Sequence, residues 1–363
     1  MLHSDLFEFV NLRVETAETC ALLIEHRRVA DALGLCRSLL EHVLLMKLLS
    51  RGDRYFQLAP AKGGIEAALL RATEELDELH AKGERNDILY VAEYPGSSNR
   101  QVMYVLDGLR SRENPADWVS YHYFAFQRFR PATMRLDEED YASYIPSEFA
   151  FDDQVRDSRR MHRREAKNTY QLYLSYGALL TCLGINDLVD AGAVSRIDAH
   201  YTFLGQFLHP THDAARSLHV NSNHHMGGTQ SGLRQQYDPA SVLLSAMYVI
   251  WLLRTLLEEI CFVIDRAPSE YFAEAGTSEL HLLLDQIPAR YGYFWFVWNE
   301  APLWDKYNHA VVHATDEQLR QAGGFAGLGS SEVKFDYNIL GHFKSGLTSW
   351  SNLRVGNYRP PFA

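Results

Sequence analysis

The chain has 363 residues, of which 47% are hydrophobic and 22% charged, and its formal net charge at pH 7 is -11. This is the composition of a soluble globular protein with enough length for one large or two medium domains. The negative charge argues against broad wrapping of nucleic acid, although a local basic patch can still bind it. The four cysteines (Cys20, Cys36, Cys182, Cys261) form no C-x-x-C pair, so we expect free, buried thiols in a reducing compartment.

The longest apolar segment, residues 241–264, contains Arg254, Glu258 and Glu259. These charges favour a buried amphipathic helix over a membrane span. The first fifteen residues, MLHSDLFEFVNLRVE, lack the basic and then apolar pattern of a signal peptide. We therefore expect a cytoplasmic protein with no membrane partner.

Helical periodicity dominates the beginning of the chain. Apolar residues recur at helical spacing over residues 5–30, and the leucine-rich residues 28–50 predict a second helix despite Gly34. Residues 63–82 predict a third helix with an acidic face, which Gly83 closes.

Residues 88–106 have the composition of strands. Two segments, 88–94 and 101–106, are rich in β-branched and aromatic residues, and the PGSSNR sequence between them is typical of a turn. This pattern predicts a β-hairpin inserted between helices. The aromatic-rich residues 107–145 predict an irregular connection that packs onto the helices.

The second half of the chain returns to helical patterns. We predict a long helix over residues 147–183, a break at 184–187 and a helix that ends at His209. The polar, glycine-rich residues 217–237 predict a mobile loop. Asp238 and Pro239 then open a helix that continues to about Asp265.

Residues 278–315 predict one or two further helices, broken near Pro288 and Pro302. The predicted fold class is mainly α, an antiparallel helical bundle with one inserted β-hairpin. We expect a single domain over residues 1–320, which includes the hairpin insertion 87–107, followed by a C-terminal extension over 321–363.

The leucine-rich second helix carries three polar residues, Arg37, Glu41 and His42. Arg37 and Glu41 share a helix face, and the R-x4-H spacing lets Arg37 and His42 border one groove. A guanidinium beside an imidazole suits phosphodiester chemistry, because it supplies a cation for the phosphate and a proton acceptor. The competing interpretation is a structural Arg37–Glu41 pair, with His42 a hydrogen-bonded core residue.

A second polar group lies at His209 and His212. Because Pro210 disfavours α conformation in the preceding residue, His209 should lie at a helix C-terminus, where the macrodipole favours a protonated imidazole. If this helix packs antiparallel to the second helix, His209 can approach Arg37 and Glu41. Alternatively, His209 caps the terminal carbonyl groups of its own helix.

The R-x3-E-H pattern in an early leucine-rich helix and the Y-x7-H-P-T helix end resemble uncharacterised all-helical bacterial proteins allied to the HEPN (higher eukaryotes and prokaryotes nucleotide-binding) superfamily. The resemblance implies a metal-independent ribonuclease in toxin–antitoxin or phage-defence systems. It implies that the protein is a homodimer, that RNA is a partner, that a regulatory protein is possible and that no cofactor is needed.

Under this hypothesis Arg37 binds the scissile phosphate and His42 is the general base or acid. Glu41 positions Arg37, and His209 with His212 completes the pocket. A helical face with basic side chains would hold the RNA; on a helix these residues fall within an arc of roughly 140°. They are Arg156, Arg159, Arg160, Arg163, Arg164 and Lys167. The same face also suits solvent exposure or salt bridges between subunits.

Two other classes of function stay open. One is a non-catalytic binding module in which Arg37, Glu41 and His209 form a buried polar network. The other is a metal-dependent enzyme that uses His209 and His212, or His309 and His313, which have i, i+4 spacing. The chain has no H-E-x-x-H motif and no paired E-x-x-H motifs, so the sequence predicts no particular metal site.

Overall fold

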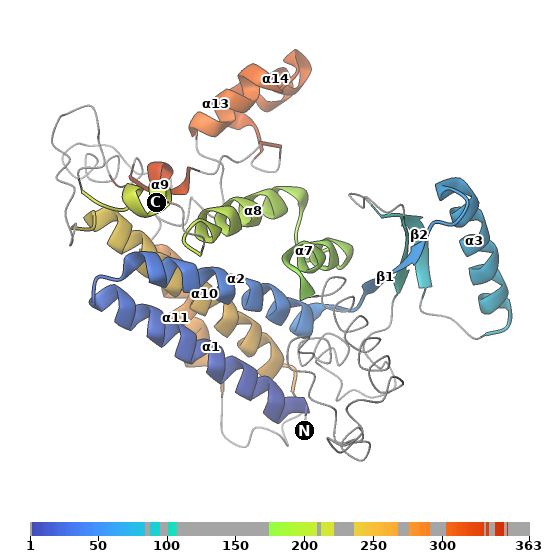
Figure 1. Ribbon diagram of the computed structural model, residues 1–363, viewed down its shortest axis with the longest axis horizontal. Coiled ribbons are helices and arrows are strands. Elements are labelled where there is room, and N and C mark those ends of the chain that lie inside the picture. The colour runs from blue at the N-terminus through green and yellow to red at the C-terminus, as the bar shows by residue number, and fades with distance from the viewer. Residues whose placement is uncertain are drawn as a thin grey trace, which may run out of the picture. The chain divides into compact units, whose positions relative to one another are not determined.

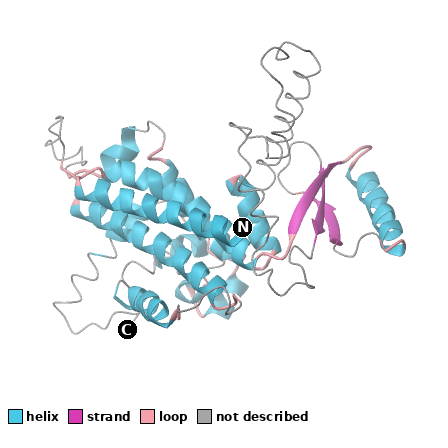
Figure 2. Cartoon of the chain, turned by 90° about the horizontal axis from the view of Figure 1, so that it is seen from below, coloured by secondary structure: helices cyan, strands magenta, loops and turns pink. Residues whose placement is uncertain are grey.

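The computed structural model of the chain describes residues 2–83, 88–94, 101–106, 174–208, 212–220, 236–267, 276–290, 303–329, 332–333, 338–344 and 347. These residues are mainly helical and include one small antiparallel sheet (Figures 1 and 2), so the predicted fold class is confirmed. The chain divides into two compact units. The first comprises residues 1–43 and 189–363, and the second comprises residues 44–188.

The first unit begins with an antiparallel helix pair, α1 (Leu2–Glu25) and α2 (Val29–Arg51), as predicted. The turn between them is tight because Arg27 adopts a left-handed conformation, with φ 57°. The amide of Arg28 then donates to the carbonyl of Leu23, which closes the end of α1 as in a Schellman motif.

Helix α8 (Ala191–Gly205) and helix α10 (Pro239–Ile264) each begin with an aspartate cap. Asp190 Oδ1 accepts from the amide of Ala193 at 2.6 Å, and Asp238 Oδ1 accepts from the amide of Ala240 at 2.9 Å. These carboxylates satisfy amides that have no partner inside a helix. The predicted start of α10 at Asp238 and Pro239 is confirmed.

A short helix, α9 (His212–Ser217), precedes the segment predicted as a loop. The ends of that segment are paired: His219 and Tyr237 form an antiparallel bridge, and their rings stack with centroids 4.4 Å apart. The loop prediction for residues 221–235 lies outside the described residues.

Helix α10 is long and apolar enough, by length and composition, to cross a membrane, and 44% of its most apolar window is buried inside the protein. This is a weak indication, because core helices of soluble proteins pass the same test. Leu244, Tyr248, Leu252 and Leu256 on α10 are fully buried, and the helix contacts α1. These side chains of α10 therefore form part of the core of the first unit.

Helix α11 (Ser278–Arg290) continues past Pro288 and ends close to the predicted break. A proline has no N–H, so the carbonyl of Leu284, one turn earlier, loses its intrahelical donor. Arg254 on α10 supplies a replacement: its Nε donates to that carbonyl at 3.0 Å. The proline is thus accommodated by a side chain from the neighbouring helix.

The later residues of the first unit form α13 (Leu303–Val312), α14 (Asp316–Ala322) and the short 3-10 helix η5 (Phe325–Gly327). Lys344 Nζ lies 2.7 Å from Oδ2 of Asp238, the capping residue of α10. This ion pair joins the helical residues near the end of the described chain to the main bundle. The break predicted at Pro302 lies outside the described residues.

The second unit contains a three-stranded antiparallel sheet in the order β1-β3-β2. Strands β2 (Ile88–Glu93) and β3 (Gln101–Leu106) pair as the predicted hairpin. Strand β1 (Tyr55–Pro60), which the sequence analysis did not identify, pairs along the other edge of β3. Its single buried aromatic residue, Phe56, and its terminal proline give a weak strand pattern, which explains the omission.

Helix α3 (Ile65–Ala81) contacts β2 and β3 through a face of Ala68, Ala72 and Leu76, which recur at intervals of four. The helix predicted over residues 63–82 is confirmed. Helix α7 (Tyr176–Ile185) begins after Ser175, whose backbone is extended and whose side chain accepts from the amide of Ala178. The single uninterrupted helix predicted over 147–183 is therefore wrong at Ser175, while residues 176–183 are helical as predicted. The remainder of that prediction, and the aromatic connection over 107–145, lie outside the described residues.

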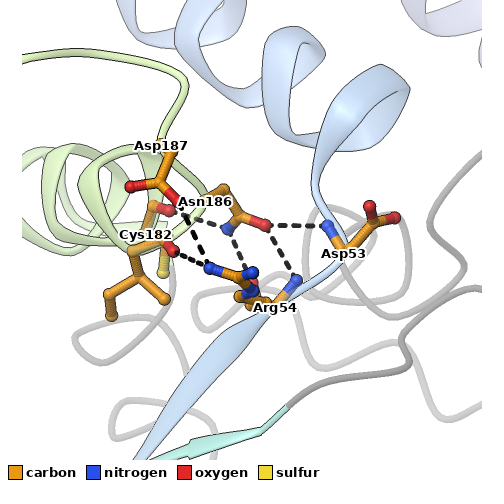
Figure 3. Close-up of polar contacts among 6 residues, drawn as sticks. Asp53, Arg54, Cys182, Asn186 and Asp187 are labelled. Atoms are coloured by element: carbon orange, nitrogen blue, oxygen red, sulfur yellow. Dashed lines mark hydrogen bonds and ion pairs between the residues drawn. The ribbon is translucent and has the colours of Figure 1, made fainter. Parts of the chain in front are cut away.

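Asn186 joins the end of α7 to the start of β1 (Figure 3). Its Oδ1 accepts from the amides of Asp53 and Arg54 at 2.7 and 2.8 Å. Its Nδ2 donates to the carbonyls of Arg54 and Cys182, both at 2.7 Å. All the ordinary hydrogen bonds of one amide side chain are therefore used in this joint.

Candidate functional site

His42 lies on α2 and faces α1. Arg13 Nη1 lies 2.7 Å from His42 Nε2, and His42 Nδ1 lies 2.5 Å from the carbonyl oxygen of Ser38. An arginine only donates, so Nε2 accepts from Arg13 and Nδ1 carries the proton that it donates to Ser38. Phe9 covers the ring, with centroids 5.7 Å apart. Both imidazole nitrogens are therefore engaged within the α1–α2 pair.

Burial and the neighbouring Arg13 charge lower the pKa of His42 to about 4, although the hydrogen bond to Ser38 opposes this shift. The ring is neutral at pH 7, and its lone pair is directed to Arg13. A group with so low a pKa is a weak proton acceptor. The electrostatics thus favour a hydrogen-bonded structural imidazole at this position.

Arg37 faces α8 instead. Its Nη2 donates to Tyr201 Oη at 2.5 Å, its Cζ lies 4.3 Å from the centroid of the Tyr201 ring, and its Nε lies 3.7 Å from Glu41 Oε1. The i, i+4 pair expected from the spacing is present, and the side chains of Arg37 and Glu41 are 20% and 32% exposed. Burial raises the pKa of Tyr201, while the hydrogen bond from Arg37 opposes that shift.

Two glycines allow α2 and α8 to approach closely. A Cβ on Gly205 of α8 would lie 3.3 Å from Arg37 Nη1, and a Cβ on Gly34 of α2 would lie 3.2 Å from Leu208 Cδ2. Gly34 lies against Leu208, and Arg37, one turn later on α2, lies against Gly205, three residues earlier in the chain. The two helices therefore run antiparallel, which is the arrangement in which His209 was expected to approach Arg37 and Glu41. This crossing also explains a glycine inside the leucine-rich helix.

Arg37 and His42 do not meet. Five positions along an α-helix separate two side chains by about 140°, and each of these residues contacts a different neighbouring helix. No hydrogen bond, ion pair or ring contact joins them in the described structure. The cation beside the imidazole is Arg13 of α1, which lies on another helix and so outside the R-x4-H motif.

A third polar contact links α8 to α10. His200 is fully buried, and its Nδ1 lies 2.9 Å from Tyr248 Oη. Burial raises the pKa of Tyr248 well above its usual value. The only sequence signal for this contact was a histidine next to Tyr201 in a helix of mixed composition, and such a signal does not indicate its partner.

Several candidate residues are not placed. His209 lies outside the described residues, and so does the whole basic face, from Arg156 to Lys167. His212 is the first residue of α9, but its side chain lies outside the description as well. Of the predicted site, Arg37 and Glu41 are brought together, while His42 is directed elsewhere.

His309 and His313 lie side by side on α13 and just after it, with ring centroids 5.4 Å apart. Burial and the charge of His313 lower the pKa of His309, and Glu332 opposes the shift. Among the residues that the structure describes, no group of three or more His, Cys, Asp or Glu side chains is arranged to hold a metal ion. These two imidazoles therefore supply no more than a pair of ligands.

The four cysteines are all buried and free, as predicted. Cys20 and Cys36 face each other across the α1–α2 pair, and Cys20 Sγ lies 3.8 Å from the carbonyl of Ala32.

Comparison of the chain with family profiles, curated proteins and solved structures finds no match in any of the three. The resemblance to HEPN proteins thus rests on the motif alone.

Proposed function

We propose that this protein is a non-catalytic helical binding module, in which the polar residues of α2 hold helices together. The observation that carries the proposal is the engagement of both nitrogens of His42 by Arg13 and Ser38, on the side of α2 that faces away from Arg37. A general base needs a free lone pair within reach of its substrate. His42 offers none while Arg13 donates to it.

The pattern extends to other helix pairs in the first unit. One polar side-chain contact joins α1 to α2, a second joins α2 to α8, and a third joins α8 to α10. Hydrogen-bonded polar groups at such contacts favour one packing arrangement, because a shifted helix would leave them unsatisfied. We therefore infer that Arg37, Glu41 and His42 fix the shape of the bundle.

A cytoplasmic location stays part of the proposal, supported by the four buried free thiols.

An RNA-cleaving effector is the second candidate. The contact between the Arg13 guanidinium and the His42 imidazole, at 2.7 Å, favours it, because phosphodiester cleavage uses such a pair. In this candidate a phosphate draws Arg13 away from His42 and frees Nε2 to accept a proton. Arg13 then takes the role that the sequence analysis gave to Arg37.

The two candidates differ in an RNA cleavage assay with purified protein and a chelator present. The binding module predicts no cleavage above background by the wild type. Arg13→Gln and His42→Gln would be assayed alongside, with the exposed Arg28→Gln as a matched control. Cleavage by the wild type and by Arg28→Gln that disappears in folded His42→Gln would overturn the proposal in favour of the effector.

A further inference from the structure

Arg13 is a partly buried cation that forms no ion pair with any residue the structure describes. In the described structure its side chain contacts His42 and the ring of Phe9, whose centroid lies 5.5 Å from Cζ, and it makes no ion pair. Its Nε is buried and has no hydrogen-bond acceptor. Burial lowers the pKa of Arg13, and no carboxylate among the described residues offsets the shift.

A desolvated guanidinium with no anionic partner is costly, and such groups are normally paired. Because Nη1 is directed to His42, the edge formed by Nε and Nη2 is left over. That edge carries two parallel N–H groups, and this geometry matches two oxygens of a carboxylate or phosphate. The residue as a whole is only half-buried, although Nε itself is buried, so an oxyanion would reach this edge from the exposed side of the guanidinium.

We propose that Arg13 binds an oxyanion, the phosphate or carboxylate group of a ligand, and that His42 positions its guanidinium by accepting from Nη1. This inference rests on the proposed function, in which the protein binds rather than cleaves, and it names the chemistry of the ligand. Phe9 contributes an apolar wall beside the cation. Arg37 is unsuited to the same task because Glu41 already lies beside its guanidinium.

The test is a titration of the full chain with inorganic phosphate, adenosine monophosphate and succinate in separate arms. Binding would be followed by calorimetry and by the NMR signal of the His42 ring, which His42→Gln assigns. An oxyanion on Arg13 partly cancels the positive charge beside His42, so the pKa of His42 should rise from its value of about 4. Tighter binding of adenosine monophosphate, inorganic phosphate or succinate identifies a nucleotide, free phosphate or a carboxylate as the source.

Arg13→Gln should weaken binding about tenfold or more, since it removes the charge-assisted hydrogen bonds. Arg13→Lys, which keeps the charge but loses the paired donors, should bind with intermediate affinity. Arg28→Gln, an exposed arginine changed in the same way, should bind like the wild type.

Absence of saturable binding of all three ligands up to about 10 mM overturns the inference, and so does equal affinity in folded Arg13→Gln. If Arg13→Gln does not fold, the wild-type titration of His42 decides, because an unchanged pKa at saturation excludes a site on Arg13. The RNA cleavage assay separates the two proposals. Binding together with cleavage contradicts only the proposed function, whereas neither binding nor cleavage contradicts only this inference.

Discussion

Arg37 and His42 lie five positions apart on α2 and hold two different helices. Arg37 donates to Tyr201 of α8, and His42 accepts from Arg13 of α1. A motif that suggests one shared groove in the sequence thus becomes two separate packing contacts in the structure. This divergence is the reason for preferring a structural role for both residues.

The lowered pKa of His42 predicts a pH-dependent stability. In the unfolded chain the ring titrates near 6.5, whereas in the folded protein it titrates near 4. Between these values the unfolded state binds more protons, so the free energy of unfolding should fall as the pH drops from 6.5 to 4, by about 2 to 3 kcal/mol. Urea denaturation at several pH values in this range measures how the free energy of unfolding changes with pH. In His42→Gln the decrease between pH 6.5 and 4 should be smaller by about 2 to 3 kcal/mol. The same pH dependence of the free energy of unfolding in His42→Gln as in the wild type would contradict a lowered pKa of His42 in the folded protein.

Arg254 and Pro288 should be energetically coupled. Arg254→Met leaves the carbonyl of Leu284 without a donor and should cost about 1 to 3 kcal/mol. Pro288→Ala restores an N–H within α11, so the cost of Arg254→Met should be smaller in that background. A double-mutant cycle isolates this effect from the loss of the ion pair with Glu258, because both arms share that loss. Equal costs in both backgrounds would show that the two residues act independently.

Asn186 should be essential to the joint between α7 and β1. Asn186→Ala removes hydrogen bonds to Asp53, Arg54 and Cys182 and should cost about 2 kcal/mol or more. Asn186→Asp should also destabilise the joint, because a carboxylate cannot donate to two carbonyl groups. Amide hydrogen exchange would show lost protection at β1, while the exposed Asn308→Ala should leave it unchanged. Protection of β1 that survives Asn186→Ala would refute this account.

Gly205 should resist substitution where another helical glycine does not. A Cβ at Gly205 approaches the Arg37 guanidinium, whereas a Cβ at Gly177 of α7 meets no atom within 4 Å. Gly177→Ala should therefore stabilise the protein by a few tenths to about 1 kcal/mol through helix propensity. Gly205→Ala should give no such gain, because its Cβ crowds the Arg37 guanidinium and forces it to shift by a few tenths of an ångström against Tyr201. Thermal unfolding would compare the stability of the two variants with that of the wild type. An equal gain in stability from Gly177→Ala and Gly205→Ala would argue against a close α2–α8 crossing.

Local patterns predicted much of the fold. Helical periodicity located α1, α2 and α3, and β-branched and aromatic residues with a turn located the hairpin. Strand β1 was missed although it is as long as β2 and β3, because its sequence has a weak strand pattern, it follows a helix closely, and it depends on pairing with β3, a long-range contact that leaves no local signal.

The candidate site was less accessible to prediction for the same reason. The spacing of Arg37 and Glu41 identified their ion pair, because both residues lie on one helix. The partners Arg13, Tyr201 and Tyr248 come from other helices, so only the packing of the bundle reveals them. A histidine in an apolar helix indicates that a partner exists and does not say which residue provides it.

The most direct test of the central claim is the free energy of unfolding of Arg37→Ala, measured by urea denaturation beside the exposed control Arg28→Ala. If Arg37 holds α2 to α8, the variant should lose about 1 to 3 kcal/mol, since Tyr201 and the partly exposed Glu41 both lose their contact with the guanidinium. The control should stay within about 0.5 kcal/mol of the wild type. Wild-type stability in Arg37→Ala would contradict the structural role and return Arg37 to consideration as a catalytic residue.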